Sequence, residues 1–239
     1  MGGTTLPGEA FLRANVPGFA LIDPEEPMIL PLEARMFGMF VGFSVVWAYL
    51  VAIGRGRAKG MPPAPILLIL VLFVGVMGVD GLNATAYDLH QNLPMIPFLY
   101  EPRLQWRLAT GLLTGIAFAG ILTPVVNFTL WRANDPRPIM ENWKQVLIAL
   151  ALAAGLFLAN ESRLGILFYP FAILTDVGVL VLVGLINMVF LLSLFRKEGL
   201  AVTWFDALNP LAAGVLLGLI ELGGLALIRY AVLGTTILS

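Results

Sequence analysis

The chain has 239 residues, of which 59% are hydrophobic and only 12% are charged, and its formal net charge is −1. Soluble domains carry about 25% charged residues and about 45–50% apolar ones, so a soluble fold of this length could not bury so much apolar surface. The absence of cysteine excludes disulfides and thiolate chemistry, the single His90 excludes a site with several histidine ligands, and the small net charge gives no field that would recruit nucleic acid.

The N-terminal part, residues 1–34, is expected to form an extramembrane or interfacial segment. Its apolar runs are short and interrupted by prolines, and it opens without a basic stretch, so it does not read as a signal peptide. Residues 35–239 are expected to form a transmembrane helical domain.

Six stretches are apolar enough to cross the hydrocarbon layer, which takes about 20 helical residues. They are expected at about Met36–Ile53, Pro65–Val79, Leu104–Trp131, Gln145–Ala159, Pro170–Phe195 and Pro210–Leu233. A merged or re-entrant segment around Ile166–Pro170 is an alternative for the start of the fifth. The predicted fold class is therefore an all-α, polytopic bundle of about six spans.

Basic residues predict the orientation of the bundle, because cytoplasmic loops carry an excess of Lys and Arg. The loops after the first, third and fifth spans contain Arg55, Arg57, Lys59, Arg132, Arg137, Lys144, Arg196 and Lys197. These loops are expected on the cytoplasmic side of the inner (plasma) membrane, which puts both termini on the other side.

A polar cluster is expected where the spans meet the non-cytoplasmic surface. Arg35 opens the first span, Asp80 closes the second with Asn83 one turn later, and Arg107 opens the third. The full candidate cluster is Arg35, Asp80, Asn83, Arg107, Asp176, Glu221 and Arg229. The alternative is a structural one, since helix ends commonly attract charge and Arg side chains snorkel there.

Glu221 is the most informative member, because it lies near the middle of the sixth span. A charged group at that depth costs about 2.5 to 3.5 kcal/mol, so it is usually paired, protonated or facing water. It predicts either a proton or cation site or a carboxyl group that fixes helix packing. Asp176 and Arg229 have opposite charges at similar depth on the last two spans and are expected to form a structural ion pair.

Small residues one turn apart are expected to let helices approach closely. They occur as Gly38/Gly42, Gly111/Gly115 and Gly214/Gly218. The expected partners are membrane lipids, with other membrane subunits or further copies of the chain docking through these small-residue faces.

Two segments resemble a family of predicted bacterial membrane proteins of unknown function. Pro31–Gly38 is similar to a helix-opening Pro-Leu-Cys-x-Arg-Cys-x-Gly segment of that family, and Asp80-Gly81 with Arg107–Gly111 is similar to its Asp-Gly and Arg-x-x-Thr-Gly segments. The resemblance covers roughly residues 31–125. It implies that Glu33 and Met36 stand where the family carries cysteines, so a thiol or metal role is not carried over.

Three functions compete, in this order. The first is a non-catalytic subunit or binding scaffold of a membrane complex. The second is a small transporter or channel for an ion, a proton or a solute, and the third is a lipid-modifying enzyme that uses the outer charges on a phosphate headgroup. No catalytic residue, metal site or cofactor is indicated, and the sequence leans away from an enzyme.

Overall fold

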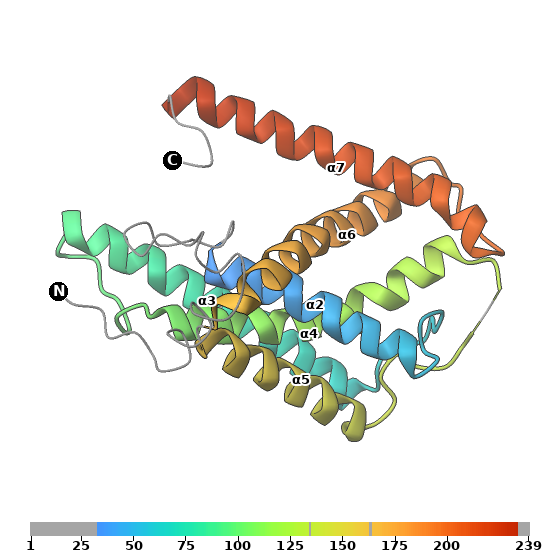
Figure 1. Cartoon of the computed structure of the whole chain (residues 1–239), viewed down its shortest axis with the longest axis horizontal. Coiled ribbons are helices and arrows are strands. Elements are labelled where there is room, and N and C mark those ends of the chain that lie inside the picture. The colour runs from blue at the N-terminus through green and yellow to red at the C-terminus, as the bar shows by residue number, and fades with distance from the viewer. Residues whose placement is uncertain (1–32, 134, 163, 234–239) are drawn as a thin grey trace.

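The computed structural model describes residues 33–133, 135–162 and 164–233 and is all-helical over that part of the chain (Figure 1). Its elements are α2 (Ala34–Ala52), α3 (Ala64–Asn92), α4 (Leu104–Leu130), α5 (Trp143–Glu161), the short 3₁₀ turn η2 (Gly165–Leu167), α6 (Phe168–Leu194) and α7 (Trp204–Leu233). Six of these helices are long and apolar enough to cross a membrane. The protein is therefore a multi-pass membrane protein with six candidate spans among the described residues, as the six apolar stretches of the sequence predict.

The centre of the bundle is the pair α2 and α4, held together through glycines. A Cβ atom on Gly111 would lie 2.2 Å from the carbonyl oxygen of Arg35, and one on Gly115 would lie 2.5 Å from the backbone nitrogen of Phe43. Gly38 also leaves no room for a side chain, because its Cβ would lie 2.7 Å from the carbonyl oxygen of Leu108. The close helix approach predicted from these residues is thus made within the chain.

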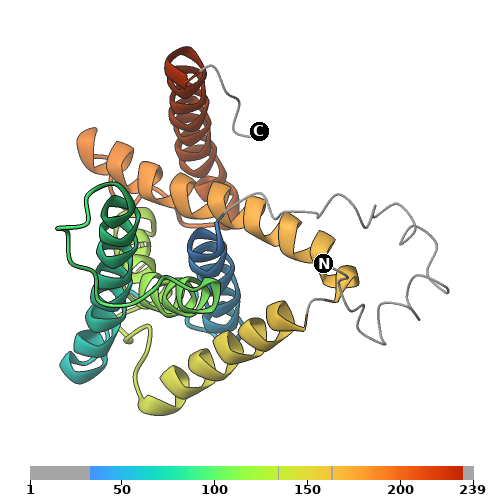
Figure 2. The same ribbon diagram turned by 90° about the vertical axis from the view of Figure 1, so that its left-hand side faces the viewer.

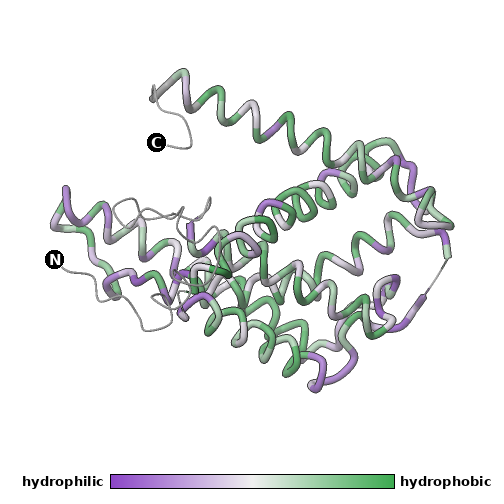
Figure 3. The backbone as a smooth tube through the Cα atoms, in the orientation of Figure 1, coloured by the Kyte–Doolittle hydropathy of each residue, from purple (hydrophilic) through white to green (hydrophobic). Residues whose placement is uncertain are grey.

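The outermost helix is α7, which packs on α6 and then leaves the bundle (Figures 1 and 2). The absence of a side chain at Gly214 permits this close crossing, since a Cβ atom there would lie 2.2 Å from the carbonyl oxygen of Gly184. Beyond the crossing, α7 stands away from the other helices although it is apolar along most of its length (Figure 3). In the most apolar 18-residue stretch of α7, only 11% of the residues are buried by the described chain, whereas 67% are buried in the corresponding stretch of α4.

The second span is longer than the sequence predicts, because α3 continues from Val79 to Asn92. The prediction followed the end of the apolar run, but a helix needs only its own backbone hydrogen bonds and can extend past the lipid. Asp80 and Asn83 are consequently buried on the inner face of a continuous helix. His90 lies on the last turn of α3, where its Nδ1 is hydrogen-bonded to the carbonyl oxygen of Ile96 (2.7 Å).

The last span begins earlier than predicted, at Trp204 instead of Pro210. The reason is a capping box: the Asp206 carboxylate accepts the backbone N–H of Thr203 at 2.8 Å, and the Thr203 hydroxyl accepts the N–H of Asp206 at 3.4 Å. Of the merged or re-entrant alternatives for Ile166–Pro170, the structure agrees with the merged one, since η2 leads directly into α6 and the apolar stretch runs without a break from Gly165 to Leu194.

The loops that carry most of the basic residues meet at one end of the bundle. Gly60 and Pro138 form an isolated bridge, and Arg55 donates to the carbonyl oxygen of Pro138 (2.9 Å) and is paired with Glu141. These contacts join the segment after α2 to the segment after α4. The end opposite holds the polar residues described next.

Candidate functional site

Asp80 is the hub of a buried polar network at the end where α2 and α4 begin. Its side chain is only 2% exposed. Arg35 donates to Oδ2 through Nη2 (2.7 Å) and Nε (3.2 Å), Tyr100 donates to Oδ1 through its hydroxyl (2.6 Å), and the Thr110 hydroxyl lies 3.3 Å from Oδ2. One carboxylate thus ties together α2, α3, α4 and the loop before α4.

Asn83 fixes that loop one turn further along α3. Its Oδ1 accepts the backbone N–H groups of Leu99 (2.7 Å) and Tyr100 (3.3 Å), while its Nδ2 donates to the carbonyl oxygen of Tyr100 (2.9 Å). These three hydrogen bonds hold the loop so that the Tyr100 hydroxyl reaches Asp80. Burial and the hydrogen bond to Asp80 raise the pKa of the Tyr100 hydroxyl to about 12.

The predicted cluster lacks two members of this network, Thr110 and Tyr100, and Tyr100 is the harder of the two to predict from the sequence. The only signal was a phenol in the loop directly before the third span, and many membrane proteins place tyrosines at that depth for interfacial reasons. Its role depends on Asn83 folding the loop back onto α3, which no periodicity in the sequence encodes.

Arg107 belongs to the same end of the bundle but has a different partner. Its Nη1 donates to Glu33 Oε1 at 2.6 Å, and this pair is partly exposed. The Nε atom is buried and finds no hydrogen-bond acceptor among the described residues. The structure therefore gathers four of the seven predicted residues at this end: Arg35, Asp80, Asn83 and Arg107.

Two of the other three predicted residues, Glu221 and Asp176, are not part of this network. Glu221 lies on α7 and accepts a hydrogen bond from Asn187 Nδ2 on α6 (2.8 Å). Asp176 is exposed on α6 and makes no ion pair with a described residue. The side chain of Arg229 lies outside the described part, so the expected pair of Asp176 with Arg229 stays a prediction.

The Asp80 network is suited to holding helices together and not to binding a substrate. Arginine, a phenol and a threonine hydroxyl surround both carboxylate oxygens, which leaves little capacity for a substrate or an ion. Among the described residues, no three His, Asp or Glu side chains lie close enough together to hold a metal ion. A buried carboxylate with all its partners in place rigidifies a fold and specifies one arrangement of helices.

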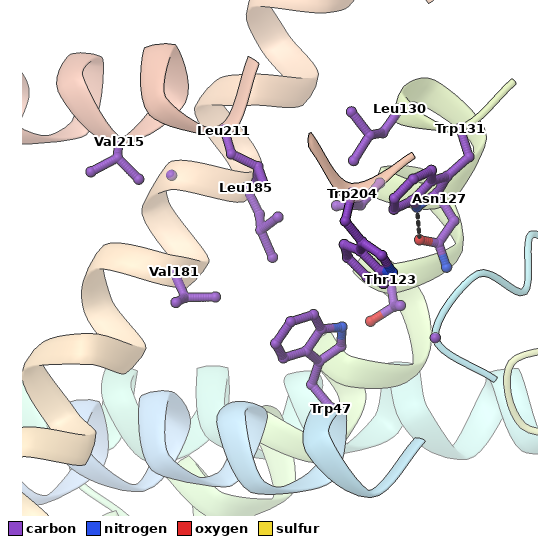
Figure 4. A pocket seen from close by; sticks show the side chains of 13 residues that line it. Trp47, Thr123, Asn127, Leu130, Trp131, Val181, Leu185, Trp204, Leu211 and Val215 are labelled. Carbon is purple, nitrogen blue, oxygen red and sulfur yellow. Dashed lines mark hydrogen bonds between the residues drawn. The ribbon is translucent and has the colours of Figure 1, made fainter. Parts of the chain in front are cut away.

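A separate pocket lies toward the opposite end, between α2, α4, α6 and the start of α7 (Figure 4). Its volume is about 240 Å³, and its lining is almost entirely apolar. Three of the five tryptophans share its walls, namely Trp47, Trp131 and Trp204. Tryptophans near the ends of spans are typical of the aromatic belt at a membrane interface, and nothing in their spacing along the sequence indicates that these three surround one space.

The aromatic wall is held in place by the loop that follows α2. The Arg57 guanidinium lies 4.0 Å from the ring centroid of Trp131 and 5.0 Å from that of Trp204. Asn127 completes the support, because its Oδ1 accepts the Trp131 indole N–H (3.2 Å) and its Nδ2 donates to the carbonyl oxygen of Ala58 (2.8 Å). The pocket is thus built from parts of the chain that are distant in sequence.

Residues 27–121 match the family described as "Predicted membrane protein (DUF2085)", which is less than half of the 239-residue chain. No curated protein and no solved structure matches. The match confirms a resemblance to an uncharacterised membrane family, while the replacement of cysteines by Glu33 and Met36 stays a prediction. The matched region contains the whole Asp80 network, but of the residues that line the pocket it contains only Trp47 and Gly56, since the lining residues of α4, α6 and α7 all lie beyond residue 121.

Proposed function

We propose that this protein is a non-catalytic subunit or binding scaffold of a membrane complex, and that α7 receives a transmembrane helix of another polypeptide. The observation that carries the proposal is Glu221, a carboxyl group exposed near the middle of a helix that stands away from its own bundle. The rest of the bundle holds α7 through its contact with α6.

Glu221 has one hydrogen-bond partner in the described chain and room for more. A carboxylate offers about four acceptor positions, and Asn187 occupies one of them. Leaving a charged group at this depth facing lipid costs about 2.5 to 3.5 kcal/mol. A neighbouring helix with a donor side chain at the same depth would remove much of that cost, which makes the open side of Glu221 a binding position.

Small residues next to Glu221 support a helix as the occupant. Gly223 and Gly224 follow it closely, and Cβ atoms on them would meet nothing within 4 Å. By contrast, α6 occupies the space beside Gly214 and Gly218, which lie earlier on the same helix. Small residues that no other part of the described chain covers allow a second helix to approach the backbone closely.

The proposal is tested by isolating the tagged protein from its native membranes in mild detergent, as wild type and as Glu221→Leu. The expected wild type migrates as a complex of defined mass with a second membrane polypeptide or further copies, and Glu221→Leu migrates as the monomer. Glu198→Leu, which removes a carboxylate from the loop after α6, is the matched control and retains the complex. A monodisperse wild-type monomer would contradict the proposal.

A proton or cation carrier is the second candidate, and the Glu221–Asn187 pair is the observation that favours it, because an intramembrane carboxyl group beside an amide can bind and release a proton. Reconstitution into liposomes distinguishes the two. A carrier gives a flux that Glu221→Gln abolishes, whereas a scaffold gives the same flux as empty liposomes.

A further inference from the structure

We propose that the tryptophan-walled pocket between α2, α4 and α6 binds the flat ring of a neutral, lipid-soluble molecule, and that a carbonyl oxygen on this ring accepts a hydrogen bond from Thr123. The ligand chemistry is that of a quinone headgroup. This site is independent of the α7 surface around Glu221.

Thr123 is the observation that points to a ligand. The residue is only 3% exposed, and its hydroxyl has no hydrogen-bond partner among the described residues. Figure 4 shows the hydroxyl directed into the pocket between Trp47 and Trp204. A buried hydroxyl without a partner costs free energy, so its orientation toward an apolar space indicates that the occupant supplies the acceptor.

Other buried threonines on these helices behave differently. Thr114 and Thr129 on α4 donate to the carbonyl oxygens four residues earlier, each at 2.9 Å, and Thr175 on α6 does the same at 2.6 Å. That bond is the ordinary way for a helical threonine to satisfy its hydroxyl. Thr123 has the same option on the same helix and does not use it.

The size and lining of the pocket fit one substituted ring. An apolar cavity of roughly 150 Å³ in another protein stays dry and takes up benzene, so about 240 Å³ accommodates a six-membered ring with small substituents. Water is a poor occupant, because it needs about two to four polar partners, and among the described lining side chains Thr123 carries the one fully buried oxygen or nitrogen atom that lacks a hydrogen bond. Indole faces also favour a flat ring over a flexible chain.

The pocket has a route to the outside for a hydrophobic tail. Trp204, which forms one wall, is 52% exposed, and it lies at the first residue of α7 beside the end of α4. A ring carried on a long apolar chain can therefore enter from the membrane and leave its tail in lipid. An acyl chain alone would fill the volume but leave the Thr123 hydroxyl unpaired.

The test uses the purified full-length protein and two probes, a benzoquinone bearing a ten-carbon chain and decylbenzene, followed by tryptophan fluorescence and by the shift in Tm. The quinone is expected to bind saturably and to raise Tm. Thr123→Val, which preserves shape but removes the hydroxyl, is expected to weaken binding by about three- to tenfold. Thr129→Val, whose hydroxyl is bonded within α4, is the matched control and leaves binding unchanged.

Two results would overturn the assignment. Equal saturable binding of decylbenzene and the quinone, unaffected by Thr123→Val, would mean that the pocket takes an apolar chain. Quenching by the quinone that never saturates, or that persists when Val181→Trp fills the pocket, would mean that the probe only partitions into the detergent or lipid. The comparison of the two probes on the wild-type protein stands even if a variant fails to fold.

Discussion

Substituting Asp80 by asparagine removes one negative charge from the hub of the network while keeping its shape. The amide that replaces the carboxylate would still offer an oxygen to Tyr100 or Thr110, but Arg35 would lose its counter-ion. Removing one partner of a buried ion pair costs about 3–5 kcal/mol. The Arg35 side chain is 17% exposed, so water relieves part of the penalty and we expect a loss near the lower end, about 3 kcal/mol.

A double-mutant cycle separates the ion pair from the rest of the network. Arg35→Met alone should cost less than Asp80→Asn, because Tyr100 and Thr110 still donate to the remaining carboxylate. The double variant contains no unpaired buried charge, so it should be more stable than the sum of the single losses predicts, by about 2 kcal/mol.

The assay is reversible unfolding in mixed micelles by a denaturing detergent, followed by tryptophan fluorescence. Asp135→Asn is the control, since Asp135 pairs with Arg137 at an exposed position and should change stability by less than about 1 kcal/mol. If Asp80→Asn costs no more than Asp135→Asn, or if the cycle is additive, the Asp80 network does not stabilise the fold in the way described.

Three further predictions follow from the same geometry. Gly111→Ala should destabilise the protein by about 1–3 kcal/mol in the same unfolding assay, because the added methyl group meets the α2 backbone, whereas Gly223→Ala in open space should cost nothing. Stability should fall between pH 10 and about 12 through Tyr100: its pKa is higher in the folded protein than the ordinary value of 10, so the folded state retains a proton that the unfolded state releases, and Tyr100→Phe should remove this part of the pH dependence. Asn127→Ala should cost about 1–3 kcal/mol by leaving the indole N–H of Trp131 unpaired, and the emission spectrum of the variant should change with it; an unchanged midpoint would refute the support of the pocket wall.

The sequence predicts the parts of this fold that depend on local composition. Six apolar runs become six helices, and small residues such as Gly38 and Gly111 become close helix contacts. The convergence of Arg35, Asp80 and Arg107 also follows from simple placement, because residues at the same ends of neighbouring spans lie at the same depth.

What the sequence could not predict depends on tertiary packing. The extension of α3 to Asn92 is invisible to hydropathy, since Asp80 and Asn83 look like the start of a loop until Arg35 and Tyr100 are known to cover them. The pocket is hidden for the same reason. Its walls come from several helices, and Thr123 differs from other threonines only in where its hydroxyl points.

The α7 surface can be mapped directly because the chain has no cysteine, so a single introduced thiol carries a photo-crosslinker to one chosen position. Leu225 is exposed on α7 one turn from Glu221, and Leu68 is equally exposed on α3 and serves as the control.

In native membranes, we expect a crosslinker at Leu225 to join the protein to one defined polypeptide, either a second protein or another copy, and Glu221→Leu to abolish that product. The same probe at Leu68 should react with lipid alone. A probe at Leu225 that labels only lipid, or a crosslinked product that survives Glu221→Leu unchanged, would contradict the role of α7 as the surface that binds a partner.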